Sequence, residues 1–223
     1  DTRGMITYCN DAFVEISGFN RVDLIGAPQN IVRHPDVPSA VFAHMWTALK
    51  QGSPWMGIIK NRSKNGDHYW VNAYVTPIFE GSQVVGFESV RVKPTTEQIR
   101  RAEALYRRIS KGKSAISSRD KWQPALLSCL PFIAMGLVGT ISGLLLAPSL
   151  AFVVAAGVSV PLGLMIAHWQ KQGTIRLLQM AERSTSDQLI AKMYSDESGP
   201  QALLETALIS QAARLKTGLT RLQ

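Results

Sequence analysis

The sequence predicts an α+β protein in which a small antiparallel sheet with short helices precedes a membrane hairpin and further helices. Three successive runs of β-branched and aromatic residues are separated by turn signals, which is typical of a strand meander. A stretch of 44 residues, Pro124–Ala167, contains no Lys, Arg, Asp, Glu or His. Two helical segments then follow. We therefore expect four units, with boundaries at residues 1–94, 95–122, 123–168 and 169–223.

Short helices are expected to precede the sheet. A β-like run, Met5–Asn10, opens the domain, and Asn10 and Asp11 offer N-terminal capping for the next helix. Glycines then end successive elements. The expected segments are helices at Ala12–Ser17 and Arg21–Ile25, a polar loop at Pro28–Asp36 and a helix at Ser39–Gln51.

Three strands are expected next, at Trp55–Arg62, His68–Phe79 and Gln83–Val92. The tetrapeptide Lys64-Asn65-Gly66-Asp67 is a strong hairpin signal between the first two. Side chains alternate between the faces of a strand, so Trp70, Asn72 and Tyr74 share one face and Tyr69 points the other way. The chain begins at Asp1 without an initiator Met, so we expect it to be a piece of a longer protein that lacks one preceding strand.

The uncharged stretch is long enough for two membrane spans, because one span needs about 20 apolar residues. Ala147-Pro148-Ser149 divides it into Gln123–Leu146 and Ser149–Ala167. Formal net charge is +8, and eight basic residues lie between Arg100 and Lys121. Basic residues beside both ends of the run predict a hairpin in the bacterial inner membrane with both polar segments in the cytoplasm. The basic cluster then faces membrane lipids rather than nucleic acid.

Helices are expected on both sides of the hairpin. Thr95–Ile109 carries an apolar stripe, and Thr174–Ser186 is amphipathic. Asp196–Pro200 breaks the latter, and Ala202–Leu222 follows. In this last helix the steps between Leu208, Ala212, Leu215, Leu219 and Leu222 are those of a coiled-coil seam, which predicts a homodimer or a higher assembly. Cys9 and Cys129 are expected to be buried thiols without a disulfide.

The motifs favour binding over catalysis. The sequence has no Gly-rich phosphate loop and no HExxH, CxxC or GxSxG motif, so we expect no enzyme, no catalytic residue and no metal site. Groups suited to an aromatic cofactor with an anionic tail gather between Asn30 and Tyr69. Arg33 suits a phosphate or ring carbonyl, and His34 and Asn30 add hydrogen bonds. Further candidates are the aromatic residues Trp46, Trp55, Tyr69 and Trp70 and the strand residues Asn61 and Asn72.

Each candidate also has a purely structural interpretation. Trp46 and Trp55 suit a hydrophobic core, Asn61 suits a turn, and Asp36 suits a helix entry. His44 and His68 are expected to be solvated, with haem ligation as the alternative. From composition alone the ligand stays open.

Several motifs resemble the PAS domain family. Asn10-Asp11-Ala12-Phe13, Ser17-Gly18-Phe19 and Leu24-Ile25-Gly26 are similar to its opening pattern, and the segment from Asn61 to Gly66 is similar to its hairpin. This resemblance covers about residues 1–94 and implies an antiparallel sheet with helices on one side. The layout of two helices after a span resembles a HAMP signalling module, although the first helix lacks the Pro that many of these modules have.

A longer string resembles the bacterial aerotaxis receptor family. It runs from Asn30 to Pro38, continues through Met45-Trp46 and Pro54–Gly57, and ends with Lys60–Arg62 and His68–Val71. The resemblance implies FAD in the PAS domain and relay of flavin redox state through HAMP. The implied partners are a chemotaxis histidine kinase and an adaptor protein, reached through a segment beyond Gln223. The positions that it ties to flavin binding or signalling are Asn10, Arg33, His34, Asp36, Trp46, Trp55 and Tyr69.

One position departs from that pattern, because Gln29 stands where His is expected. If that His contacts the cofactor, the contact here differs. Two alternatives stay open for the whole chain. One is a PAS sensor of haem or another small molecule, and the other is an empty PAS dimerisation module of another kinase or cyclase.

Overall fold

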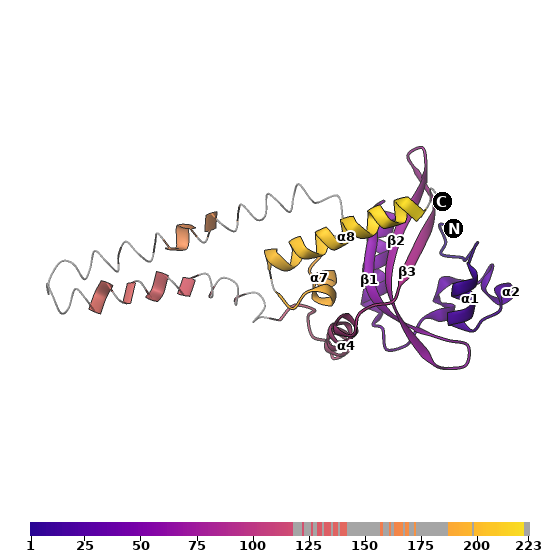
Figure 1. Cartoon of the computed structure of the whole chain (residues 1–223), viewed down its shortest axis with the longest axis horizontal. Helices are drawn as coiled ribbons and strands as arrows, with labels where there is room; N and C mark the ends of the chain where they lie inside the picture. Colours follow the sequence, from indigo (N-terminus) through magenta and orange to yellow (C-terminus); the bar gives the residue numbers. More distant parts are fainter. Residues whose placement is uncertain are drawn as a thin grey trace.

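The computed structural model describes residues 1–117, 187–197 and 199–220, together with short stretches between residues 122 and 172. Its centre is an antiparallel sheet in the order β1-β2-β3, formed by β1 (Trp55–Arg62), β2 (His68–Glu80) and β3 (Gln83–Val92) (Figure 1). The three predicted strands are confirmed to within one residue. A register shift at Ile78/Phe79 interrupts the ladder between β2 and β3.

Four short helical elements precede the sheet: α1 (Asp11–Ser17), α2 (Arg21–Leu24), the 3₁₀ helix η1 (Gln29–Val32) and α3 (Ser39–Lys50). The side-chain oxygen of Asn10 accepts a hydrogen bond from the Phe13 backbone N–H at 3.1 Å, and this caps α1. Gly18 ends α1 with a φ of 69°, a left-handed conformation that glycine adopts without strain. The predicted helices are confirmed, and the predicted polar loop contains η1.

The expectation of a β-like run at Met5–Asn10 is wrong apart from one isolated bridge between Met5 and Pro28. The backbone of Ile6 bonds instead to the turn after α2. Its N–H donates to the Ala27 carbonyl at 2.9 Å, and its carbonyl accepts from Gly26 N–H at 2.8 Å. These groups are thus satisfied without a sheet neighbour.

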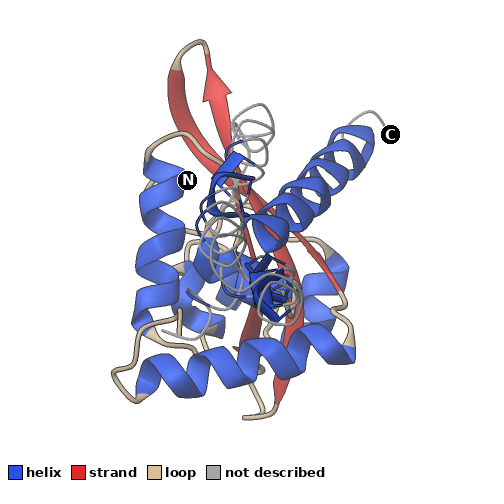
Figure 2. Ribbon diagram, turned by 90° about the vertical axis from the view of Figure 1, so that its left-hand side faces the viewer, coloured by secondary structure: helices blue, strands red, loops and turns tan. Residues whose placement is uncertain are grey.

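Helices lie on both sides of the sheet, with α1 and α2 on one side and α4 and α7 on the other (Figures 1 and 2). The second side is formed by α4 (Thr96–Ser110) and α7 (Gln188–Tyr194), and α8 (Pro200–Thr220) follows. Thr95 and Gln98 form a reciprocal capping box at the start of α4. Ile190 and Met193 of α7 are fully buried in the same hydrophobic cluster as Trp55 and Ile58 of β1. The C-terminal segment therefore shares the core of the N-terminal domain.

The predicted membrane hairpin and the predicted helix Thr174–Ser186 lie largely outside the described residues. Within the described part of the chain, no helix is both long enough and apolar enough to cross a membrane. The predicted break at Asp196–Pro200 is confirmed, because α7 ends at Tyr194 and α8 begins at Pro200.

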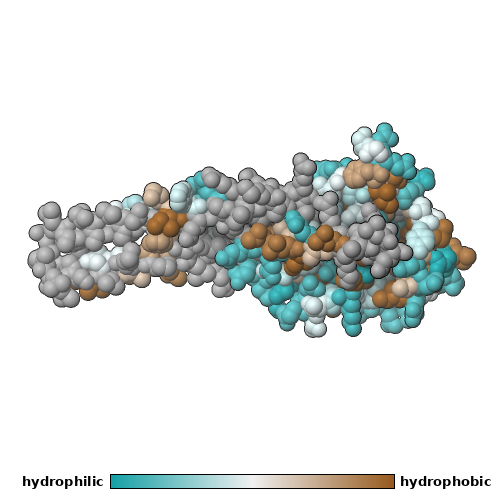
Figure 3. All heavy atoms as spheres, turned by 45° about the horizontal axis from the view of Figure 1, so that its top comes forward, coloured by the Kyte–Doolittle hydropathy of each residue, from teal (hydrophilic) through white to brown (hydrophobic). Residues whose placement is uncertain are grey.

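The outer surface of α8 is partly apolar. Leu208 and Leu215, two residues of the predicted coiled-coil seam, expose 62% and 70% of their surface. Figure 3 shows hydrophobic side chains in a row across the middle of the molecule, bordered by hydrophilic ones. The part of the seam formed by Leu208 and Leu215 is therefore exposed.

Candidate functional site

The two faces of the sheet have different neighbours. On one face Asn61 of β1 lies opposite Tyr69 of β2, and Ala73 of β2 lies opposite Arg91 of β3. Side-chain alternation places Trp70, Asn72 and Tyr74 on the other face, as the sequence predicted. The first face meets the N-terminal helices, since the Arg91 guanidinium lies 4.9 Å from the centre of the Phe13 ring. We call it the pocket face.

A cavity of about 230 Å³ is lined by the N-terminal segment, η1 and α3, and two of its wall residues, Arg33 and Trp46, contact strand residues of the pocket face. Arg33 and Trp46, both predicted site residues, contribute to its wall, and so does Gln29, where the sequence departs from the expected His. The Arg33 guanidinium stacks 4.0 Å above the centre of the Phe42 ring. The Trp46 ring meets Phe87 of β3 edge-on at 5.5 Å. The remaining wall consists of Arg3, Gly4, Pro28, Asn30 and Phe42.

Asn61 Nδ2, Tyr69 Oη and Arg91 Nη1 are buried on the pocket face, and none of them makes a hydrogen bond of ordinary geometry within the described residues. The Asn61 and Tyr69 side chains lie near enough to interact with each other, which partly offsets the effect of burial on the pKa of Tyr69. Asn61 is 2% exposed, and its backbone forms an isolated bridge with Arg33 in the cavity wall. Burial lowers the pKa of Arg91 and raises the pKa of Tyr69. A buried donor without a partner costs about 1–3 kcal/mol. The cluster is therefore suited to a polar ligand that supplies acceptors.

Three predicted residues lie nearer the surface. Asn10 uses its side-chain oxygen to cap α1. His34 Nδ1 accepts from the Asp36 backbone N–H at 3.1 Å, and burial is the main reason that the His34 pKa is lowered. The exposed Asp36 carboxylate pairs with Lys60 Nζ at 2.7 Å, and this hydrogen bond is the main reason that the Asp36 pKa is lowered. In this structure Asn10 fixes the start of α1, whereas His34 and Asp36 organise the entry to α3 and the edge of β1.

Trp55 is fully buried at the start of β1. Its ring lies over Gly57, where an added Cβ would come within 2.3 Å of the ring. The indole Nε1–H donates to His44 Nδ1 at 3.0 Å, and His44 Nε2 lies 2.6 Å from the Asp187 carboxylate. The expectation of a solvated His44 is therefore wrong, because α7 brings a carboxylate to it.

Asn72 does not join the other predicted residues. It lies on the face opposite Asn61, and its side-chain oxygen accepts a 2.6 Å hydrogen bond from the Tyr194 hydroxyl of α7. On the same face Trp70 stacks on Tyr106 of α4 with ring centres 6.3 Å apart. These contacts account for both residues, and Asn72 and Trp70 therefore belong to the face of the sheet that packs against α4 and α7.

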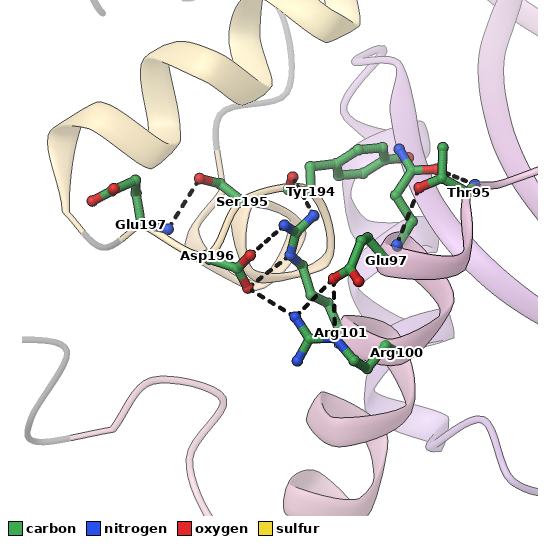
Figure 4. A network of polar contacts seen from close by, with 9 residues as sticks. Thr95, Glu97, Arg100, Arg101, Tyr194, Ser195, Asp196 and Glu197 are labelled. Atoms are coloured by element: carbon green, nitrogen blue, oxygen red, sulfur yellow. Dashed lines mark hydrogen bonds and ion pairs between the residues drawn. The ribbon is translucent and has the colours of Figure 1, made fainter.

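A polar network joins α4 to the end of α7 (Figure 4). Arg101 Nε donates to Asp196 at 2.8 Å, and its Nη1 donates to the Tyr194 carbonyl at 3.1 Å. Arg100 adds an ion pair with Asp196 at 3.5 Å. The hydroxyl of Tyr106 donates to the Ile58 carbonyl of β1, so α4 is also tied to the sheet edge. Together these bonds hold the C-terminal end of α7 against the domain.

Sequence reasoning missed Arg91 and His44. A usable signal existed for Arg91, because alternation along β3 places it on the same face as Phe87. His44 gave no comparable signal, since its partners stand 11 and 143 residues away in the chain.

Comparison with known proteins identifies the class of the N-terminal domain. The family described as PAS fold matches residues 6–91. Residues 6–91 therefore form a PAS domain, and the expected α+β fold is confirmed for this part of the chain. Solved structures with low similarity include the Aureochrome1 LOV photoreceptor in its light state. It is 16% identical, the match covers 43% of this chain and 75% of that one, and the TM-score is 0.41.

Among curated proteins, the chain is similar to the aerotaxis receptor of Escherichia coli K12, with 43% identity over 162 residues. The match covers 70% of this chain, and it covers 32% of the relative, so the chain spans about a third of that protein. The nitrogen fixation regulatory protein of Klebsiella pneumoniae is 31% identical over 35% of this chain and 16% of its own length. The predicted resemblance to aerotaxis receptors is thereby confirmed.

Proposed function

We propose that this chain is the sensory part of a membrane-anchored redox sensor that binds FAD in its PAS domain. The observation that carries the proposal is the buried polar cluster of Asn61, Tyr69 and Arg91 on the sheet. The backbone bridge between Asn61 and Arg33 links this cluster to the wall of the cavity. The resemblance to aerotaxis receptors independently favours FAD over other ligands. In this proposal the sensor acts by changing its own conformation.

The donor set fits a flavin. The Asn61 amide and the Arg91 guanidinium offer N–H donors to carbonyl and ring-nitrogen acceptors, and Trp46 offers an aromatic wall. Arg33 offers a cation to the phosphates of the cofactor tail. The cavity is smaller than the roughly 300–1,000 Å³ of ligand pockets in general, so Arg33, Phe42 or Trp46 moves aside when the ring enters. Gln29 provides a neutral amide in the same wall.

A bound flavin supplies a ring whose charge and protonation change on reduction. The Arg91 cation and the Asn61 amide then favour a different hydrogen-bond arrangement, because each responds to charge at the acceptor. Asn61 stands on β1, whose opposite face contacts α4 and α7, and Arg91 stands on β3, which pairs with β2, a strand that contacts the same two helices. The signal therefore passes through the sheet to the HAMP-like helices by direct contact.

The uncharged stretch Pro124–Ala167 serves as a membrane hairpin in this proposal. Its basic flanks keep the PAS domain and the C-terminal helices together at the cytoplasmic face of the inner membrane. The exposed Leu208 and Leu215 of α8 support a homodimer or a larger receptor assembly. The downstream partners are a chemotaxis histidine kinase and an adaptor protein.

The absorption spectrum of the full chain, purified in detergent or lipid nanodiscs, tests the cofactor. The expected result is one FAD per chain, with a spectrum that bleaches on reduction. The Arg33→Ala variant should lose FAD, whereas Arg62→Ala, an exposed arginine on the neighbouring strand β1, should keep it. A haem spectrum, or purified protein that binds no added FAD, would overturn the proposal.

A further inference from the structure

A chain of hydrogen bonds links three elements that are distant in the sequence. Trp55 of β1 donates to His44 of α3 at 3.0 Å, and His44 lies 2.6 Å from the carboxylate of Asp187. The same carboxylate accepts from the Leu189 backbone N–H at 2.8 Å and so caps α7. We propose that His44 is a positioning residue that couples the orientation of the Trp55 indole to the docking of α7. This inference rests on the proposed function, since it names the route of the signal.

The chemistry of the three side chains fixes the direction of the bonds. An indole N–H can only donate, so His44 Nδ1 must be an unprotonated acceptor. The proton of the neutral imidazole then resides on Nε2 and is donated to Asp187. One ring therefore serves both neighbours at once.

We call the hydrogen-bonded residues Trp55, His44 and Asp187 the relay. The Asp187 carboxylate connects the relay to helix α7. Its Oδ2 faces His44 and its Oδ1 caps the helix, so a displacement of His44 pulls on the capping group. The hydrogen bond with His44 is the main reason that the pKa of Asp187 is lowered. The carboxylate thus remains charged as both acceptor and cap.

Trp55 is positioned to respond to a change on the pocket face and to transmit it to His44. Its ring is fully buried and lies against Gly57 on the pocket face, the face that carries Asn61 and Arg91. A change of side-chain packing on that face therefore shifts the indole, and the shift alters the bond to His44.

The two ends of α7 are held by different parts of the domain. The N-terminal end depends on His44 and Trp55, whereas Tyr194 and Asp196 at the other end bond to Asn72 of β2 and to Arg101 of α4. A helix of seven residues is about 10 Å long. When Trp55, His44 and Asp187 move while the C-terminal end of α7 stays fixed, α7 tilts. Because α8 follows α7 in the chain, the tilt is passed on to α8.

Hydrogen exchange of residues 187–195, measured by mass spectrometry on the full chain in nanodiscs, tests the relay. Trp55→Phe removes the bond to His44, and His44→Phe removes the bonds to both Trp55 and Asp187. Both variants keep an aromatic ring, and each should speed exchange in α7 about tenfold. The double variant should exchange no faster than either single one, because both changes break the same chain of bonds. His44→Gln, which can accept and donate at once, should restore slow exchange. Thr47→Ala, an exposed position on α3, is the matched control and should leave exchange unchanged.

Two results would overturn the proposal: unchanged exchange of α7 in Trp55→Phe, or additive effects in the double variant. Exchange of β1 and β2 amides in the same spectra separates loss of the relay from unfolding of the sheet. Absorption at flavin wavelengths is recorded on the same samples. Absence of flavin contradicts the proposed function and leaves the coupling measurable, whereas additive effects in flavin-loaded protein contradict the relay alone.

Discussion

The hydroxyl of Tyr194 on α7 donates a 2.6 Å hydrogen bond to the side-chain oxygen of Asn72, in the middle of the central strand β2. Tyr194 is 4% exposed, and burial raises its pKa far above the ordinary value of 10.0. The phenol therefore stays protonated and remains a donor at every physiological pH. A strand residue of the PAS domain and a helix beyond the predicted membrane hairpin are thus joined directly.

Replacing this hydroxyl should loosen the docking of α7. Tyr194→Phe keeps the ring and leaves the Asn72 oxygen without its partner, so docking should weaken by about 1 kcal/mol. Hydrogen exchange of residues 187–195 in the full chain measures the change. Tyr8→Phe, at a position that is 79% exposed, is the control and should have no effect. Equal exchange in wild type and Tyr194→Phe would mean that the bond contributes nothing to docking.

The position of Asn72 illustrates what the sequence could predict. Alternation with a period of two placed Trp70, Asn72 and Tyr74 on one face and Tyr69 on the other, and the strand register agrees. The sequence could not predict what covers that face. Tyr194 lies 122 residues further along the chain, and no local pattern relates the two residues. Asn72 was consequently grouped with Asn61 in one site although the two side chains point to opposite sides.

The pocket face was only partly predictable for a related reason. Arg33, Trp46 and Asn61 can be predicted because their side chains suit a cofactor and because the surrounding motif resembles that of aerotaxis receptors. Arg91 did not stand out, since an arginine near the end of a strand is usually solvated. Only the pairing of β3 with β2 places its guanidinium beside Phe13.

Gly57 should be needed for the position of Trp55. Its φ is not unusual, and the constraint is steric, because an added Cβ would come within 2.3 Å of the indole ring. Gly57→Ala should therefore displace the ring and destabilise the PAS domain by about 1–3 kcal/mol, as overpacking does in other cores. Denaturant unfolding followed by tryptophan fluorescence measures both effects.

Gly86→Ala is the matched control for this substitution. It lies in the same sheet, and its added Cβ would come no closer than 3.8 Å to other atoms. We expect it to unfold like the wild type. Equal stability of the two alanine variants would contradict the steric argument.

Replacing Arg91 should preserve or raise the stability of the cofactor-free protein but weaken the binding of FAD. Its Nη1 atom is buried without a hydrogen-bond partner among the described residues, so Arg91→Met should leave the cofactor-free protein at least as stable as the wild type. If the guanidinium donates to FAD, the same change should weaken FAD binding by at least tenfold, the effect of losing a charge-assisted bond. Thermal unfolding and FAD titration measure the two effects. Strong destabilisation with unchanged FAD affinity would instead make Arg91 a packing residue.

Acid should release α7 from the domain. The hydrogen bond with His44 is the main reason that the pKa of Asp187 lies below 3.8, and the hydrogen bond with Arg101 has the same effect on Asp196. A carboxylate with a lowered folded-state pKa stabilises the fold above its unfolded pKa and loses this contribution as pH falls through the folded value. The contacts of α7 should therefore be intact above about pH 4 and lost progressively below it.

Spin labels at Thr47 of α3 and Leu208 of α8, both exposed, report this release as a change in their separation between pH 6 and pH 3. The double variant Asp187→Asn, Asp196→Asn should show no such transition, since its amides do not titrate in this range. A transition that persists unchanged in the double variant would assign acid release to other carboxylates. A separation that stays constant in the wild type down to pH 3 would show that the buried contacts of Ile190 and Met193 hold α7 without the charged forms of Asp187 and Asp196.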